Sequence, residues 1–324
     1  MKPFENINKA YNTVFKQNEL SIGLVVPIEK YSTGPVPTMK DHLLRVKQVE
    51  SLGFKSIWIR DIPFNVPNFG DAGQTFDPFT YLGFLAGQTS KIALGISSIA
   101  LPLHHPLHVA KSATSIDQLS DGRLLLGVAS GDRFDEYPAM GIDYENRGEL
   151  FQESFNYIRN VQSDFPSFET DNYGNVQGNI DMLPKPTAHK IPLLMTGSSR
   201  QSLEWNAKNA DGWMNYPRDL YTQNNTIRQY RELVAKTSEF DKPFMQPMYL
   251  DLLEDANAKP QPIQLGYRLG VNHLKNYLNK LQSIGVNHLA LNLRFNSMSV
   301  DKTLELLANH VLPEFHSTEN IKLS

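Results

Sequence analysis

Residues 92–129 read IALGISSIALPLHHPLHVAKSATSIDQLSDGRLLLGVA, and their pattern indicates the fold class. Two short apolar runs, 92–100 and 123–129, have the length of buried strands. Between them, residues 106–119 have the length and amphipathic composition of a helix, with Pro106 at its first position. A strand, a helix and a second strand in this order predict parallel strands joined by a crossover helix, and therefore an α/β protein.

The same alternation extends in both directions along the chain. We expect strands at 21–26, 56–60, 92–100, 123–129, 191–195, 212–215, 244–252 and 288–293. The helices expected after them are 38–51, 78–89, 106–119, 147–161, one that begins at Ser199, 221–237, 271–284 and 300–311. Eight strand–helix units in 324 residues predict a single-domain (β/α)8 TIM barrel rather than a doubly wound sheet.

Two segments depart from this alternation. Residues 1–20 precede the first strand as an N-terminal extension, and we expect a polar helix there that covers the bottom of the barrel. Residues 164–190, between the fourth and fifth strands, are rich in Gly, Pro and Asn, which indicates an inserted loop. We expect this loop to run over the carboxyl-terminal face of the barrel as a lid.

The composition favours a globular protein that binds a small molecule. Hydrophobic residues make up 40% of the chain, and 31 Lys and Arg against 34 Asp and Glu give a formal charge of −3. This charge provides no general attraction to nucleic acid or to an anionic membrane. The chain has no cysteine, which excludes disulfides, thiol nucleophiles and Cys-ligated metal sites. No apolar stretch approaches the roughly 20 residues of a membrane span, and the N-terminus is too polar for a signal peptide, so we expect a cytoplasmic protein.

The strongest site signal is the segment 195–202, MTGSSRQS, where an apolar strand ends in a small polar turn that leads into a helix. Unpaired backbone N–H groups at a helix start, together with Ser hydroxyls and an Arg side chain, favour phosphate binding. In a barrel this turn lies at the carboxyl-terminal face. The alternative is that Ser198 or Ser199 only caps the helix.

Other patterns are weaker. The small residues at 127–132 allow a flat ligand to approach the backbone, although a turn shaped for packing has the same sequence. His104 and His108 are four residues apart, but Pro106 lies between them and no acidic residue is nearby, so we expect no metal site. Arg147 is expected to form a structural ion pair. The motifs GxSxG, HExxH, the P-loop and a strand followed by GxGxxG are all missing, which disfavours a hydrolase or an NAD-fold enzyme.

Residues 95–141 and 196–213 resemble the signature of the bacterial luciferase-like flavin monooxygenases. The family's ordered series is matched at Leu101-Pro102-Leu103, His105-Pro106, Ala110-Lys111, Asp117, Ser120, Gly122-Arg123, Gly127, Gly131, Glu136, Gly141 and Arg147. The resemblance implies a (β/α)8 barrel that binds FMN or the deazaflavin F420 at its carboxyl-terminal face.

The resemblance also implies a set of cofactor-binding residues. Ser97 and Ser98 occupy the position of the family's non-proline cis peptide bond beside the flavin ring. The turn under the flavin is matched by Ala129, Ser130 and Gly131. The phosphate-binding helix start is matched by Gly197, Ser198, Ser199, Arg200, Gln201 and Ser202.

Two departures from the luciferases proper limit what the resemblance implies. Ile62 stands where they have a catalytic His after the second strand, so light emission is not expected. Ala129 and Ser130 stand where they have a reactive Cys and a phosphate-contacting Arg. We therefore expect Arg133 or Arg200 to supply the positive charge.

These observations predict a two-component monooxygenase that receives reduced FMN from a separate NAD(P)H:flavin reductase and uses O₂ to oxygenate a small organic substrate. The flavin carries the chemistry, while the protein binds, orients and excludes water. Asp61, Arg60 and Arg294, at the ends of the second and eighth strands, are candidate catalytic side chains, and each could equally be a surface or ion-pair residue. Two alternatives are an F420-dependent hydride-transfer oxidoreductase and a flavin-binding protein without catalysis. The resemblance implies a homodimer, while the substrate and the reductase do not follow from the sequence.

Overall fold

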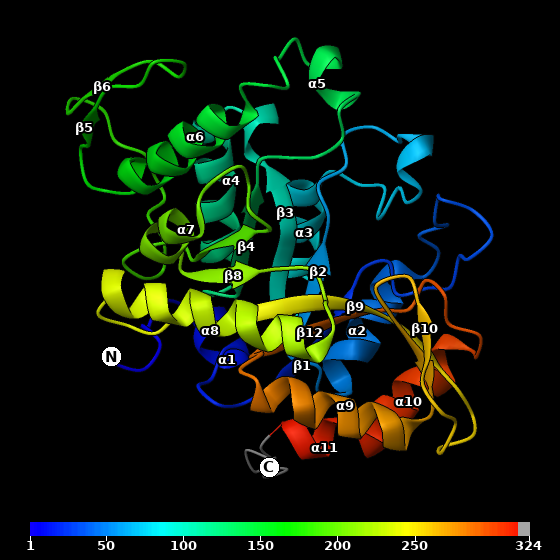
Figure 1. Ribbon diagram of the computed structural model, residues 1–324. Helices are drawn as coiled ribbons and strands as arrows, with labels where there is room; N and C mark the ends of the chain where they lie inside the picture. Colours follow the sequence, from blue (N-terminus) through cyan, green and yellow to red (C-terminus); the bar gives the residue numbers. More distant parts are fainter. Residues whose placement is uncertain (317–324) are drawn as a thin grey trace, which may run out of the picture.

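The computed structural model describes residues 1–316, and its centre is a closed barrel of parallel strands (Figure 1). The barrel closes because β12 pairs with both β1 and β9, and β9 also pairs with β8. The predicted (β/α)8 barrel is therefore confirmed. Its strands are β1 (Ser21–Val25), β2 (Ser56–Ile59), β3 (Ala93–Ala100), β4 (Leu124–Ala129), β7 (Leu193–Thr196), β8 (Gly212–Met214), β9 (Phe244–Leu252) and β12 (His288–Asn292).

A helix follows each barrel strand and packs on the outside of the barrel. These helices are α2 (His42–Ser51), α3 (Pro78–Ala86), α4 (Pro106–Leu119), α6 (Arg147–Val161), α7 (Leu203–Asn209), α8 (Leu220–Thr237), α9 (Val271–Ser283) and α10 (Val300–His310). Helix α2 begins later than residue 38 because Met39 and Asp41 have φ values of 56° and 57°, outside the helical region. Within residues 1–316, no helix has both the length and the apolar character that crossing a membrane requires.

Shorter elements decorate the barrel. They are α1 (Lys9–Val14), η1 (Pro67–Phe69), η2 (Leu101–Leu103), α5 (Glu136–Ala139), α11 (Leu312–Phe315), the strands β5 (Ser167–Phe168) and β6 (Val176–Gln177), and the strands β10 (Gln261–Ile263) and β11 (Gly266–Leu269). The pair β10–β11 was not expected from the sequence, and it extends the sheet because β11 pairs with β9.

One layer of side chains fills the inside of the barrel. Gly95 faces the ring of Trp58, and a Cβ at this position would lie 2.2 Å from that ring. Helix α1 packs Tyr11 and Val14 against the same layer and closes one end of the barrel. The layer consists of Val25, Trp58, Ala93, Leu125, Leu194, Met214, Met245 and Ala290.

A buried histidine joins the strands near α1. His288 is fully buried, and its Nε2 accepts a hydrogen bond from the Trp58 indole N–H at 2.9 Å. Its Nδ1 lies 2.6 Å from the Ser21 hydroxyl, which also bonds the carbonyl oxygen of Val14. Because Nε2 accepts, the ring is neutral and carries its proton on Nδ1. Burial lowers the pKa of His288 to about 3, with the charge of His316 adding to the effect.

Acid should destabilise the protein through His288. The unfolded histidine, with a pKa near 6.5, takes up a proton as the pH falls below that value, whereas the folded one does not. The free energy of unfolding should therefore fall by roughly 2 kcal/mol between pH 7 and pH 5 through this residue alone. Urea unfolding at both pH values should show a smaller loss in His288→Gln than in the wild type. The exposed His310→Gln is the control and should keep the full loss, whereas equal losses in all three proteins would contradict this account.

The insertion 164–190 lies along the outer side of α4 and α6. Lys111 and Gln118 of α4 donate to the carbonyl oxygens of Leu183 and Lys185, and Asn172 bonds Glu153 of α6. Figure 1 shows β5 and β6 beyond α6, at the edge of the molecule. The segment supplies no residue to the wall of the main cavity described below. Its role as a lid stays a prediction.

Candidate active site

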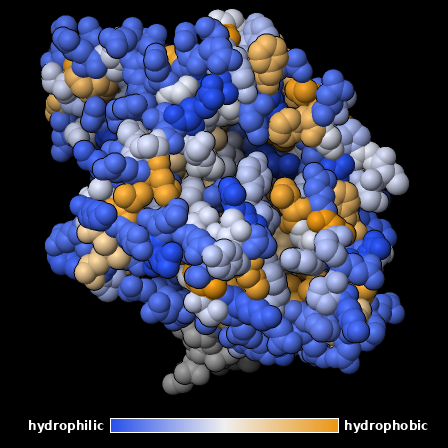
Figure 2. All heavy atoms as spheres, in the orientation of Figure 1, coloured by the Kyte–Doolittle hydropathy of each residue, from blue (hydrophilic) through white to orange (hydrophobic). Residues whose placement is uncertain are grey.

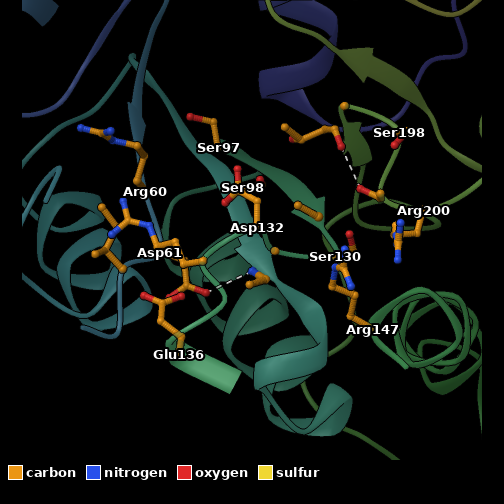
Figure 3. A pocket seen from close by; sticks show the side chains of 18 of the residues that line it. Arg60, Asp61, Ser97, Ser98, Ser130, Asp132, Glu136, Arg147, Ser198 and Arg200 are labelled. Carbon is orange, nitrogen blue, oxygen red and sulfur yellow. Dashed lines mark hydrogen bonds between the residues drawn. The ribbon is translucent and has the colours of Figure 1, made fainter. Parts of the chain in front are cut away.

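A cavity of about 370 Å³ opens at the carboxyl-terminal ends of β2, β3, β4 and β7. In Figure 3, Ser198, Arg147 and Arg200 lie on one side of it. Arg60, Asp61 and Glu136 lie on the other side, with Ser97 and Ser98 between the two groups. The cavity therefore has two polar ends and a middle of small residues. Most of the residues that the sequence singled out line it, namely Arg60, Asp61, Ser97, Ser98, Ala129, Ser130, Gly131, Arg133, Gly197, Ser198, Ser199 and Arg200.

Small residues form the middle of the cavity wall. The Ser97–Ser98 peptide bond is cis, as predicted, and the pairing of β3 with β4 shifts register at this point. Gly131 has a φ of 75°, and a Cβ there would lie 2.5 Å from the Tyr137 hydroxyl. This hydroxyl donates to the Ser130 carbonyl oxygen and fixes the turn after β4. A flat ligand can therefore approach the backbone closely between the two ends.

One end of the cavity, called here the Arg200 end, is formed by Tyr144, Arg147 and residues 197–200. The guanidinium of Arg147 lies 3.4 Å from the centre of the Tyr144 ring and donates to the Tyr144 carbonyl oxygen. Arg200 pairs with Glu145 at 3.3 Å, but both side chains are exposed, so this pair is weak and can open toward a ligand. Arg147 is also the first residue of α6, where the helix terminus adds partial positive charge. This end is suited to an anionic group.

The helix predicted from Ser199 begins later, at Leu203. Ser199 and Arg200 have φ values of 45° and 61°, so the chain makes a left-handed turn before the helix can start. Ser202 is the residue that caps α7, by accepting from the Trp205 N–H, and Gln201 donates to the Gly148 carbonyl oxygen. Neither Gln201 nor Ser202 lines the cavity, so their predicted place in the cofactor site is not supported. Arg147, predicted to form an ion pair, lies 4.0 Å from the carboxylate of Glu145 and also lines the cavity.

The opposite end, called here the Arg133 end, is formed by Arg60, Asp61, Asp132, Arg133 and Glu136. It is organised by Asp71, a buried residue of the loop between β2 and α3 that the sequence did not indicate. Burial raises the pKa of Asp71. The opposite effect of Arg60, the Gly73 N–H and Arg294 is larger, so the net shift of this pKa is downward. The carboxylate accepts hydrogen bonds from Tyr31 (3.2 Å), Arg60 (3.0 Å), Gly73 N (2.9 Å) and Tyr249 (3.1 Å).

Arg294 was predicted to face the substrate, and the structure places it outside the cavity wall. Its guanidinium lies 3.3 Å from Asp71 and donates to the Gly34 carbonyl oxygen. It also lies over the rings of Tyr31 and Phe295, at 5.0 and 5.2 Å. These contacts assign Arg294 to the ion-pair role that the sequence left open.

Asp61 forms an ion pair with His104, which sequence spacing did not reveal. Its carboxylate accepts from His104 Nε2 at 2.7 Å and from the Ala100 N–H at 3.1 Å, and its side chain is 2% exposed. Burial lowers the pKa of His104, but the hydrogen bond and charge of Asp61 raise it more, so the net shift is upward. His104 and Asp61 are 43 residues apart in the chain, which explains why no local pattern shows the pair. No group of three or more His, Asp or Glu suited to a metal ion occurs among residues 1–316.

A second, apolar cavity of about 140 Å³ adjoins the first at the mouth of the barrel. Arg60, Ser97, Thr196 and Tyr216 line both cavities. The rest of its wall is mainly apolar and includes Val25, Met214, Met245, Pro247, Met248, Leu265 and Ala290. The two cavities together offer space for a flat polar ligand and a small organic molecule beside it.

The sequence pattern of the family described as luciferase-like monooxygenase matches residues 20–247, more than half of the chain. The chain belongs to this family. A beta chain of alkanal monooxygenase from Photorhabdus luminescens is 26% identical over 255 residues, which are 73% of this chain and 72% of that protein. An uncharacterised protein from Mycobacterium tuberculosis is 30% identical over 187 residues, covering 53% of this chain and 66%, just under two thirds, of that protein.

Several solved structures superpose on the barrel described above. Monooxygenase RslO1 from Streptomyces bottropensis superposes with a TM-score of 0.76 at 18% identity, over 91% of this chain and 99% of that one. An F420-dependent secondary alcohol dehydrogenase gives 0.74 at 17% identity, over 90% and 98%. The oxygenating component of 3,6-diketocamphane monooxygenase from Pseudomonas putida, in complex with FMN, gives 0.71 at 14%, over 92% and 99%. At these identities the likeness shows the fold alone, and membership of the luciferase-like monooxygenase family supports an oxidoreductase.

The Asp61–His104 pair makes a testable prediction. In Asp61→Asn the carboxylate charge is gone, so burial dominates and the pKa of His104 should fall below its value in the wild type, from above 6.5 to below it. Because the raised pKa stabilises the fold only while His104 is protonated, this substitution should cost about 1–2 kcal/mol more at pH 6 than at pH 9. Titration of the histidine rings by NMR measures the shift, with His108 as an internal control. An unchanged His104 titration in the variant would refute the pairing.

Proposed function

We propose that this protein is a two-component monooxygenase that uses reduced FMN, supplied by a separate flavin reductase, and O₂ to oxygenate a small organic substrate. The proposal rests on the shape of the main cavity. One end has donors suited to an anion, the middle is lined by small residues, and an apolar cavity adjoins it. Family membership and the FMN bound in the diketocamphane enzyme support the choice of flavin.

The residues of the Arg200 end fit the phosphate of FMN. Arg147, Arg200 and the exposed Ser198 hydroxyl offer charged and neutral donors on one side of the cavity. Ser97, Ser98 and Ala129 leave room beside them for the flat ring system. Arg133 was an alternative source of the phosphate's counter-charge, but its contact with Asp71 places it with Arg60 at the opposite end. We therefore assign the phosphate to Arg147 and Arg200.

The chain's own task is to bind, orient and keep water out. Reduced FMN, when bound, supplies the electrons that activate O₂. The methionine side chains of the adjoining cavity provide an apolar, adaptable surface for the organic part of the substrate. Exclusion of water at this point protects reactive species from hydrolysis. Asp61, held by His104 and Ala100 N–H, is the candidate for holding or moving a proton at the cavity wall.

Binding of reduced FMN tests the proposal. Arg200→Gln and Arg147→Gln should each weaken it about tenfold, roughly 1.4 kcal/mol, because each removes one charged donor to the phosphate. Anaerobic titrations followed by fluorescence measure the dissociation constants, and reduced F420 is titrated in parallel. Arg228→Gln, an exposed residue of α8, is the matched control and should bind as the wild type does. Tight binding of F420 without FMN would assign the protein to hydride transfer, and flavin binding without O₂-dependent product would leave only a flavin-binding protein.

We also propose a homodimer formed through α3 and α4. A groove of about 600 Å³ lies between these helices, and its wall combines apolar residues, among them Phe79 and Leu119, with polar ones such as Asp77, His108 and Lys111. Leu119 in this groove is 73% exposed, and Phe84 elsewhere on α3 is 46% exposed. Light scattering coupled to size-exclusion chromatography should give twice the chain mass. Leu119→Glu should shift the protein toward the monomer, and a wild-type monomer would contradict the dimer.

A further inference from the structure

Arg133 is a buried cation at the cavity wall without a carboxylate partner. It is 8% exposed, lines the main cavity, and its guanidinium lies 4.3 Å from the centre of the Phe69 ring. Nη2 donates to the Asp71 carbonyl oxygen at 2.9 Å, whereas Nη1 is buried and has no hydrogen-bond partner within residues 1–316. A buried guanidinium with a free donor is costly unless a group of opposite charge meets it.

Two carboxylates near Arg133, those of Asp71 and Asp61, already have other partners. The Asp71 Oδ2 atom accepts hydrogen bonds from Arg60 and Tyr249, and Oδ1 accepts from Tyr31 and the Gly73 N–H. The guanidinium of Arg294 also lies 3.3 Å from Oδ2. Asp61 is paired with His104. The Asp71 carboxylate is therefore paired with Arg60 and Arg294, whereas Arg133 contacts only the Asp71 carbonyl oxygen.

Asp132 and Glu136 also line this end, but within residues 1–316 neither carboxylate forms an ion pair within 4.0 Å with the Arg133 guanidinium. Glu136 is 3% exposed, and its Oε1 has no hydrogen-bond partner among the described residues. Burial raises the pKa of both carboxyl groups, although the charge of Arg133 opposes this shift. Neither carboxylate accepts a hydrogen bond from Nη1 of Arg133, so this donor has no direct counter-ion among the described residues.

We propose that Arg133, assisted by Arg60, binds the anionic group of the substrate, a carboxylate or a sulfonate on a small organic molecule. This inference rests on the proposed function, because it places the phosphate of the cofactor at the Arg200 end and leaves the Arg133 end to the substrate. Nη1 of Arg133 supplies the free, charge-assisted donor, and the neighbouring positive charge of Arg60 favours the same anion.

The surroundings of Arg133 indicate the rest of the substrate. Ile62, Phe69 and Tyr216 line the same cavity, and the apolar second cavity begins at Arg60 and Tyr216. Figure 2 shows apolar side chains gathered over α5. Phe134 and Met140, on either side of α5, are exposed, as are Phe64 and Phe69 in the loop after β2. An anion with an apolar or aromatic body matches this combination, whereas a strongly polar molecule such as a sugar does not.

A matched pair of probes tests the inference. Wild-type protein, with and without oxidised FMN, is titrated calorimetrically with 3-phenylpropanoate, 3-phenylpropanesulfonate and the neutral 3-phenylpropanamide. We expect the better of the two anions to bind at least tenfold more tightly than the amide, and the comparison of the two identifies the preferred group. Equal affinity for the anions and the amide in the wild type would overturn the proposal without the need for any variant.

Two substitutions then separate the ends of the cavity. Arg133→Gln should reduce anion affinity about tenfold, to the level of the amide, and leave FMN affinity within about twofold. Arg200→Gln should do the reverse. Arg133→Lys keeps the charge and should retain part of the preference for the anions over the amide. This variant replaces Arg133→Gln in the test if the Gln variant fails to fold. Loss of the anion preference in Arg200→Gln alone would place the anion at the phosphate end and refute the inference. Anion preference at Arg133 without FMN binding would instead refute only the proposed cofactor.

Discussion

The carboxylate of Asp71 holds the mouth of the barrel together. It lies in the loop after β2 and joins Arg60 at the end of β2, Tyr249 of β9 and Arg294 after β12. It also binds Tyr31, which follows β1. A carboxylate surrounded by two guanidinium groups and two hydroxyls is stable when buried, because each of its oxygens has hydrogen-bond partners. The positions of Arg60 and of the loop above the cavity both depend on this arrangement.

This arrangement determines where the charged donors of the cavity lie. Asp71 engages Arg60 and Arg294 through its carboxylate and Arg133 only through its carbonyl oxygen, so Nη1 of Arg133 remains a free donor at one end. The opposite end has its own arginines, Arg147 and Arg200, beside a left-handed turn of small residues. Between the two ends, Gly131 and other small residues leave space beside the backbone for a flat ligand. A cavity with arginine donors at both ends is suited to two ligands with anionic groups, here a flavin phosphate and an organic anion.

The barrel could be predicted from the sequence because each strand is a short apolar run and each helix has a clear period, so local patterns define every unit. The turns after β3, β4 and β7 could also be located, since small residues at strand ends are visible locally. Asp71 and His104 could not, because their partners lie on other elements and only the closed barrel brings them together. The start of the helix after β7 was predicted too early for a local reason: the positive φ of Ser199 and Arg200 delays α7 to Leu203. Arg294 shows the same limit, since its position after a strand does not tell whether it faces ligand or Asp71.

The central claim is that the two ends of the cavity have different ligands, with the flavin phosphate at Arg147 and Arg200. A crystal structure of the protein with FMN and 3-phenylpropanoate tests it most directly. The account predicts the phosphate within hydrogen-bond distance of Arg147, Arg200 and Ser198, the ring beside Ser97 and Ser98, and the carboxylate against Nη1 of Arg133. A phosphate bound at Arg133, or an FMN bound outside this cavity, would contradict it.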